Sequence, residues 1–235
     1  MNCQGFLLPF LVAWLNKLVH AEMLDYSIPG EQCGYIIERG NQYRIMTAVE
    51  GDPPTYPDNV NCVIGFRTDA SMKFFLRILS MDLEFSSQCA NDALLIYDGV
   101  TDADPLLIGH GYGICGDSLS LPNYYKSTGN EISIKFVTNS ADNQGKGFKL
   151  VLTPYEQANN ETSTCDNSDD FMCLGDLKCM IRDVECNGET QCADGSDEPS
   201  NCLSRSSAGV QVGSFALVLL LASFAAMRTF RSGIP

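Results

Sequence analysis

The sequence predicts a mainly β protein in which an antiparallel β-sandwich precedes a small module stabilised by disulfides and calcium. Short apolar or alternating runs separated by turn residues fill the stretch 33–155, and no long 3.6-residue periodicity interrupts them. Six cysteines and a dense set of carboxylates crowd the stretch 165–202. The chain has 11 cysteines. Without Cys3, which lies in the first few residues, ten remain, an even number that suits five disulfides and an oxidising compartment.

The strand predictions rest on apolar patterns. Continuous apolar runs at 73–79 and 93–97 are typical of buried strands. Apolar and polar residues alternate at 131–137 and again at 148–152. The stretch 51–59 is rich in Pro, Asp and Asn, so it predicts a loop. Strands of this length, spread over ~120 residues, predict an antiparallel sandwich that is large enough to bury a core.

The N-terminus predicts a secretory signal helix. The apolar run Phe6–Leu15 has the length of a signal-peptide core, and Val19-His20-Ala21 supplies the small residues of a cleavage site. We therefore expect residues 1–21 to be removed. The mature chain then begins at Glu22, with a short lead over residues 22–32. A core helix is the alternative interpretation of this run.

The C-terminus predicts a membrane anchor. Residues 210–227 are apolar over nearly the ~20 residues that a membrane-spanning helix needs. Arg228 and Arg231 follow directly, which favours a cytoplasmic end and a single-pass type I protein. A GPI signal is the alternative, with small residues at 206–208 and a hydrophobic tail at 215–227. Both interpretations tether the protein at the cell surface with its ectodomain outside.

Charge and reactive residues argue against two functional classes. With 15 basic against 29 acidic residues, the chain lacks the positive charge that binds phosphates, so we expect no nucleic-acid partner. This acidity suits calcium or basic protein partners. His110 is the single histidine after the predicted leader, and neither an H-E-x-x-H motif nor a nucleophile elbow accompanies it. We therefore expect no catalytic residues and no enzyme activity.

One stretch is a candidate metal site on residue types alone. Glu84 and Asp92 lie on either side of Cys89, directly before the predicted strand 93–97. Carboxylates that are held beside a cystine and a rigid strand can fix a divalent cation, because calcium takes oxygen ligands. The alternative is that both carboxylates are solvated loop residues.

An ordered set of motifs covers about half of the chain. The motifs are Cys33-Gly34, Tyr56-Pro57 before Cys62, Asp82-Leu83-Glu84 before Cys89, Ile96-Tyr97-Asp98-Gly99, Cys115-Gly116 and Gly147-Phe148. This pattern resembles the CUB domain family over residues 33–155. The resemblance implies two five-stranded sheets and the disulfides Cys33–Cys62 and Cys89–Cys115, whereas spacing alone leaves three pairings open.

The resemblance also implies one calcium ion at the stretch described above. The ligands of the family map onto Glu84 and Asp92, with Asn139 in place of a third carboxylate and Tyr56 as a supporting residue. Asp142 lies three residues further on and is a further candidate. Calcium accepts amide as well as carboxylate oxygens, so we expect a site that binds calcium more weakly than is usual in the family.

The second module follows a polar linker at 156–164. Asn160-Glu161-Thr162 is the single N-x-S/T sequon of the chain, and a glycan on Asn160 would keep the two modules apart. Residues 165–202 hold ten acidic and two basic residues, a net charge of 2 − 10 = −8. So small a segment cannot bury enough apolar surface alone, so it needs disulfides and a bound cation. Structural zinc is the alternative, but it would compete with disulfide formation.

The end of this segment carries a second resemblance. Cys192-Ala193-Asp194-Gly195-Ser196-Asp197-Glu198, followed by Cys202, is similar to the LDL-receptor class A family. Of fifteen possible connectivities, the resemblance implies Cys165–Cys179, Cys173–Cys192 and Cys186–Cys202. It also implies calcium ligands from the side chains of Asn187, Gln191, Asp197 and Glu198 and from the backbone carbonyls of Val184 and Glu189. Because Asn187 and Gln191 replace aspartates, we expect weaker calcium binding here as well.

Together, the two resemblances imply a non-enzymatic binding protein. Such modules next to a membrane anchor resemble the outer parts of co-receptors and auxiliary subunits such as the Neto-type proteins. In both families the calcium-linked residues receive a Lys or Arg from the partner. We therefore expect an extracellular or membrane protein with exposed Lys or Arg to contact Tyr56, Glu84, Asp92, Asp197 and Glu198. The alternatives are an endocytic or ligand-capturing receptor of the LDL-receptor type and an adhesion or gamete-surface protein.

Overall fold

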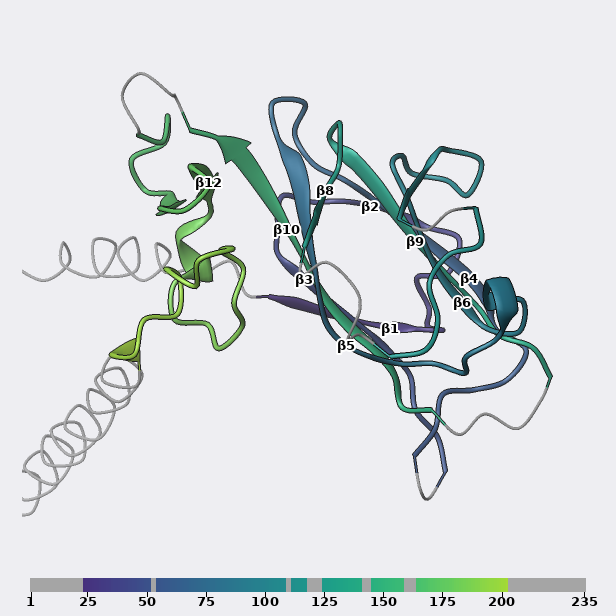
Figure 1. The fold of residues 1–235 in the computed structure, drawn as a ribbon. Coiled ribbons are helices and arrows are strands. Elements are labelled where there is room, and N and C mark those ends of the chain that lie inside the picture. Colours follow the sequence, from purple (N-terminus) through teal and green to yellow (C-terminus); the bar gives the residue numbers. More distant parts are fainter. Residues whose placement is uncertain are drawn as a thin grey trace, which may run out of the picture.

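The computed structural model describes most of the chain between the predicted signal peptide and the predicted anchor. The described residues are 23–51, 54–108, 111–117, 124–140, 145–158 and 164–202. They form two β-sheets packed face to face, with a disulfide-rich module at one end (Figure 1). Within these ranges no helix is long and apolar enough to cross a membrane. The predicted signal peptide, the segment 210–227, His110, Asp142 and Asn160 lie outside the described residues.

The first sheet is built around one long strand, β10 (Gly147–Gln157). On one side of β10 lie β3 (Tyr43–Thr47) and then the edge strand β1 (Leu24–Ile28). On its other side lies β5 (Lys73–Asp82), which also carries the short strand β8 (Tyr125–Lys126). β10 thus lies in the centre of this sheet. Its C-terminal residues extend beyond Leu152, the last residue that pairs with β3.

The second sheet has five strands in the order β2-β4-β9-β6-β7. Their bounds are β2 (Ile36–Glu38), β4 (Asn61–Arg67), β9 (Glu131–Val137), β6 (Ala93–Tyr97) and β7 (Leu106–Ile108). The apolar runs that predicted strands are parts of β5, β6, β9 and β10, and these predictions are confirmed.

Each sheet has one parallel pair, so the sandwich is mixed rather than wholly antiparallel. β1 runs parallel to β3 and β2 runs parallel to β4, while the other strand pairs of the described ranges are antiparallel. The first four strands alternate between the two sheets. Between β1 and β3 the chain therefore passes through β2 of the opposite sheet, and between β2 and β4 it passes through β3. Each of these crossings allows its pair to be parallel. The predicted mainly β sandwich is confirmed with this difference.

The hydrophobic core lies between the two sheets. Ile64 and Phe66 of β4 and Ile134 and Phe136 of β9 are fully buried there, against residues such as Leu76 of β5. Alternation along β9 places one set of side chains in this core. The core fixes the strands whose ends carry the candidate site residues.

Five disulfides stabilise the described structure. They join Cys33 to Cys62, Cys89 to Cys115, Cys165 to Cys179, Cys173 to Cys192 and Cys186 to Cys202. These are the pairs that the two resemblances implied. Three of the five lie in the small module, whose folding depends on them because its own apolar core is small.

The two modules share one sheet. The hairpin of β11 (Phe171–Cys173) and β12 (Lys178–Met180) belongs to the second module, and β12 pairs antiparallel with Tyr155, Glu156 and Gln157 of β10. In Figure 1, β10 runs out of the sandwich to meet this hairpin. The stretch predicted as a linker therefore begins inside β10, where the two modules are in contact, and the glycan on Asn160 that was expected to keep them apart lies outside the described residues. β10 continues into the stretch predicted as linker, because the hairpin satisfies its backbone groups there.

Candidate metal centres

The first candidate centre lies at the ends of several strands of the sandwich. Asp92 directly precedes β6 and Glu84 follows β5, while Asn139 follows β9. Tyr56 precedes β4, and the disulfide Cys89–Cys115 ties the loop between Glu84 and Asp92 to the segment around Cys115. The fold thus brings four residues together that are spread over more than eighty positions of the sequence.

The hydroxyl of Tyr56 organises this centre. It donates to Asp92 Oδ2 at 2.5 Å and accepts from the backbone N–H of Glu84 at 2.9 Å. The backbone N–H of Asn139 donates to the other carboxylate oxygen of Asp92 at 3.0 Å. Burial and the adjacent carboxylate of Asp92 raise the pKa of Tyr56 above its ordinary range, so the hydroxyl keeps its proton and remains a donor.

The two carboxylates of this centre differ in exposure. Asp92 is fully buried, and its hydrogen-bond donors, Tyr56 and Asn139, are both neutral. Glu84 is half-buried, and its Oε1 accepts from Asn91 Nδ2 at 2.7 Å. Among the described residues, no ion pair with Lys or Arg includes Asp92. A buried carboxylate needs a compensating charge, so this donor set fits a cation.

The second candidate centre lies in the small module around Asp197. This carboxylate is fully buried, and its Oδ2 accepts from the backbone N–H of Gln191 at 2.5 Å. Its other oxygen, Oδ1, is buried without a hydrogen-bond partner among the described residues. Burial has the largest effect on the pKa of Asp197 and raises it above the ordinary value of an aspartate. A buried carboxylate oxygen without a hydrogen-bond donor is available to coordinate a cation, which takes oxygen ligands.

The side-chain amide of Gln191 supports the same conclusion. Its oxygen is set against Asp197 Oδ2 and against the backbone carbonyl of Glu189. Three oxygens that face one another repel unless the amide turns over and donates its NH₂, or a cation lies between them. These are three of the six ligand groups that the class A resemblance implied, so the residues fit calcium.

The remaining implied ligands lie close by. Glu198 Oε1 accepts from the backbone N–H of Gly188 at 2.8 Å, and Asn187 Oδ1 accepts from the backbone N–H of Glu189 at 2.9 Å. Val184 is buried in the hydrophobic cluster of the module. In neither centre do three or more His, Cys, Asp or Glu side chains of the described residues converge. Each centre accordingly relies on amide and backbone oxygens beside its carboxylates.

Residues of the sandwich that the sequence did not single out complete the second centre. Gln42 is almost fully buried, and its Oε1 accepts from Asn187 Nδ2 at 3.1 Å and from Gln191 Nε2 at 3.0 Å. Arg44 and Lys149 contact the side chain of Glu189. Each of these three residues lies at least forty positions in sequence from the residue of the small module that it contacts, so no local pattern links them.

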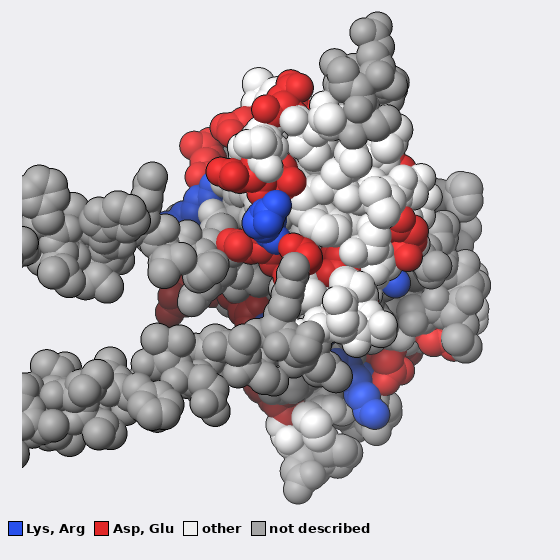
Figure 2. Space-filling model, turned by 90° about the vertical axis from the view of Figure 1, so that its left-hand side faces the viewer, with Lys and Arg blue, Asp and Glu red and all other residues white. Residues whose placement is uncertain are grey.

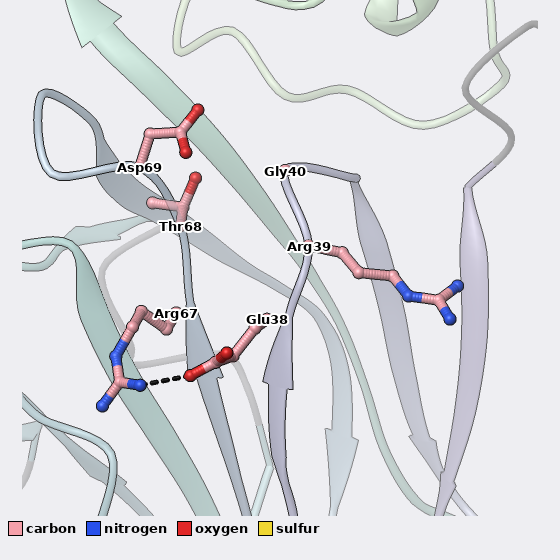
Figure 3. A pocket seen from close by; sticks show the side chains of 6 residues that line it. All are labelled: Glu38, Arg39, Gly40, Arg67, Thr68 and Asp69. Atoms are coloured by element: carbon pink, nitrogen blue, oxygen red, sulfur yellow. Dashed lines mark hydrogen bonds and ion pairs between the residues drawn. The ribbon is translucent and has the colours of Figure 1, made fainter.

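A shallow recess elsewhere on the sandwich is a weaker candidate for function. It has a volume of about 280 Å³, and its lining includes Glu38, Arg39 and Arg67. In Figure 3, Arg67 points at Glu38, while Arg39 points away from this pair. Arg67 also pairs with Glu131 at 2.7 Å, so its charge is already satisfied by the protein. The ion pairs of Arg67 thus use the cation of this recess within the protein.

Two family models match the chain. The first, described as the CUB domain, matches residues 33–152, about half of the chain. The second, described as the low-density lipoprotein receptor domain class A, matches residues 163–202. We call the two parts the CUB module and the class A module from here on. The matches agree with the resemblances that the motifs carried.

Curated relatives are similar mainly over the CUB module. Embryonic protein UVS.2 of Xenopus laevis is 38% identical over 99 residues, which are 42% of this chain and 18% of that protein. Cubilin of Rattus norvegicus is 35% identical over 99 residues, 42% of this chain and 3% of cubilin. The human tumor necrosis factor-inducible gene 6 protein is 26% identical over 166 residues, 67% of this chain and 56% of that protein. The chain thus matches less than two thirds of the length of each relative.

Two solved structures are similar to part of this chain. The MASP-1 CUB2 domain bound to Ca²⁺ matches with a TM-score of 0.40 and 17% identity, covering 52% of this chain and 98% of that one. The CUB1-EGF-CUB2 domain of human MASP-1/3 matches with a TM-score of 0.42 and 17% identity, covering 63% of this chain and 58% of that one. From the extent of the first family match, together with the motifs and the sandwich, this chain belongs to the CUB domain family and carries a class A module after its CUB domain.

Proposed function

We propose that this chain is a non-enzymatic, membrane-tethered co-receptor or auxiliary subunit that makes calcium-dependent contacts with basic side chains of a protein partner. The observation that carries the proposal is the buried Asp92, which has neutral donors only, beside the half-buried Glu84. In this arrangement the buried Asp92 can hold a cation, while the half-buried Glu84 can also contact a partner.

The family membership supports the broader part of this proposal. CUB and class A domains are families of extracellular binding modules, so the chain is an extracellular binding or receptor-like protein. These families are not catalytic. The tether rests on the apolar segment 210–227, which lies outside the described residues.

Burial narrows the set of residues that a partner can touch. Tyr56, Asp92 and Asp197 are buried, so direct contact by these three, as the sequence suggested, does not fit the structure. Glu84 and Glu198 are half-buried and can reach a partner. We therefore assign Glu84 and Glu198 to direct contact, and the buried three to positioning.

Each residue of the CUB centre then has a separate role. Glu84, Asp92 and an oxygen of Asn139 would hold the calcium ion, which supplies positive charge that fixes the carboxylates when bound. Tyr56 orients Asp92 and ties it to the backbone of Glu84. The carboxylate of Glu84 is half-buried, so a Lys or Arg of the partner can donate to it from the solvent side. Phe85 beside it is 81% exposed and offers apolar contact.

Capture of surface proteins by the full chain tests this proposal. The chain is expressed on cells, cross-linked to its neighbours, and purified with calcium or with EDTA. We expect at least one partner that is retained with calcium, lost in EDTA, and lost with Glu84→Ala. Asp102→Ala, which removes an exposed carboxylate elsewhere on the sandwich, is the control and keeps the partner. Capture that is identical in calcium and in EDTA would sink the proposal.

A further inference from the structure

The class A module is docked on the CUB module by more than a linker. β12 extends the CUB sheet by pairing with the end of β10. Phe75 and Tyr155 of the CUB module share one hydrophobic cluster with Met180, Val184 and disulfide sulfurs of the class A module. The small module thus completes its core on the outer face of the first CUB sheet, which fixes the orientation of its calcium-site loop.

A buried lysine strengthens this junction. Lys178 of β12 is fully buried, with its ammonium 3.5 Å from the ring centroid of Phe75 and within 6 Å of those of Tyr124 and Tyr155. Its charge is paired with Asp176. The cation–π contacts and the ion pair together replace the hydration that the ammonium group loses on burial.

The docked orientation brings two CUB cations to one carboxylate of the class A loop. Lys149 Nζ lies 2.5 Å from Glu189 Oε1, and Arg44 Nη1 lies 3.3 Å from the same oxygen. Glu189 is the residue whose carbonyl faces Gln191 and Asp197 at the second centre. Its side chain is 14% exposed, whereas those of Lys149 and Arg44 are 36% and 30% exposed. The cations therefore cover the carboxylate from the solvent side.

Two other cations of the CUB module contact the class A module: Lys126 lies 3.8 Å from Asp176, and Arg77 donates to the backbone carbonyl of Thr190 at 3.1 Å. Lys178 and Arg182 are the only basic residues of 165–202, and Lys178 is buried. Figure 2 shows this end of the molecule, where Asp and Glu gather and few Lys or Arg are visible. The field there attracts cations from solution. Glu189 is the acidic residue of this module that two cations of the CUB module already occupy.

We propose that the carboxylate of Glu189 is an acceptor for basic side chains that the CUB module occupies in cis, so that Lys149 and Arg44 close this carboxylate to an external lysine or arginine. An ammonium group from a partner would need to reach the carboxylate of Glu189 from solvent. Lys149 now occupies that position and pairs with the same oxygen. While the cis contact holds, a basic side chain of a partner can reach Glu84 and Glu198 but not Glu189. The proposal deepens the proposed function, because it takes basic side chains as the ligand class.

The test compares two double variants of the full chain displayed on cells. Arg44→Ala with Lys149→Ala opens Glu189. Arg67→Ala with Lys135→Ala removes the same charge and frees exposed carboxylates far from the class A loop. The probe is a fluorescent hexalysine peptide. We expect the first variant to bind it about tenfold more tightly than the second, because a half-enclosed carboxylate interacts more strongly than exposed ones. Adding Glu189→Gln to the first variant abolishes the gain.

Single variants keep the test valid if the double variant folds poorly. Lys149→Ala alone retains Arg44 and should show a smaller gain, and Glu189→Gln in the otherwise unchanged chain should leave hexalysine binding unchanged. Equal binding by the two double variants, or a gain that survives Glu189→Gln, would overturn the proposal. Repeating the comparison with Glu84→Gln separates it from the proposed function, since the gain does not depend on Glu84.

Discussion

At the scale of single residues, the Tyr56 hydroxyl carries the geometry of the CUB centre. Tyr56→Phe removes one hydrogen bond to Asp92 and one from the Glu84 backbone, both at buried positions. We expect a loss of about 1–3 kcal/mol in the free energy of unfolding, measured by urea denaturation without calcium. Tyr26→Phe is the matched control, because its hydroxyl makes no hydrogen bond to a described residue. Equal stability of the two variants would contradict this role of Tyr56.

A second prediction at this scale concerns pH. Burial lowers the pKa of Lys178 from 10.5 to about 8, against the opposing effect of Asp176. Between these two values the folded state binds fewer protons than the unfolded state, so the free energy of unfolding rises with pH in this window. We expect the difference between the native chain and Lys178→Met to rise by on the order of 2–3 kcal/mol from pH 8 to pH 10.5. A flat difference would refute the burial of a charged Lys178.

At the scale of strands, the start of β10 depends on a glycine. Gly147 has φ +84°, and a Cβ there would collide with the side chain of Thr47. Gly147→Ala should therefore lower the free energy of unfolding by more than ~2 kcal/mol, because both backbone strain and a clash are introduced. Gly129→Ala is the matched control, since a Cβ there meets nothing within 4 Å. Comparable thermal unfolding of both variants would contradict the placement of β10.

The predictability of the strands follows from what each one faces. β5, β6 and β9 show continuous or alternating apolar residues because they line the core, so sequence patterns found them. β1 lies in the stretch predicted as a short lead, although Leu24, Tyr26 and Ile28 alternate with polar residues. That alternation was the available signal. The parallel direction of β1 and β3 could not be predicted, because it depends on how the chain crosses between sheets.

At the scale of the whole molecule, the two modules form one unit. Phe75→Ala removes the CUB ring that packs against both Lys178 and the class A cluster. We expect hydrogen exchange in residues 171–180 to accelerate by at least tenfold, because that hairpin loses its support, while β4 and β9 remain protected. Unchanged exchange in 171–180 would contradict the shared core.

The contact between the two modules could not be predicted from the sequence, although the modules themselves could. The motifs predicted both modules, the five disulfides and the residues around Asp92 and Asp197, since each motif is local or follows the family order. The junction was not predicted. Arg44 and Lys149 carry no motif, and the class A pattern implied a role only for the backbone carbonyl of Glu189. The contact of these three side chains follows from the docking of the class A module on the CUB sheet.

Calcium titration of the full chain in detergent, followed by calorimetry, tests the central claim most directly. We predict two bound calcium ions per chain, with Glu84→Gln removing one of them and Asp197→Asn removing the other. Asp25→Asn, which alters an exposed carboxylate paired with Arg44, should keep both ions. No binding at millimolar calcium, or binding that neither Glu84→Gln nor Asp197→Asn reduces, would contradict the account.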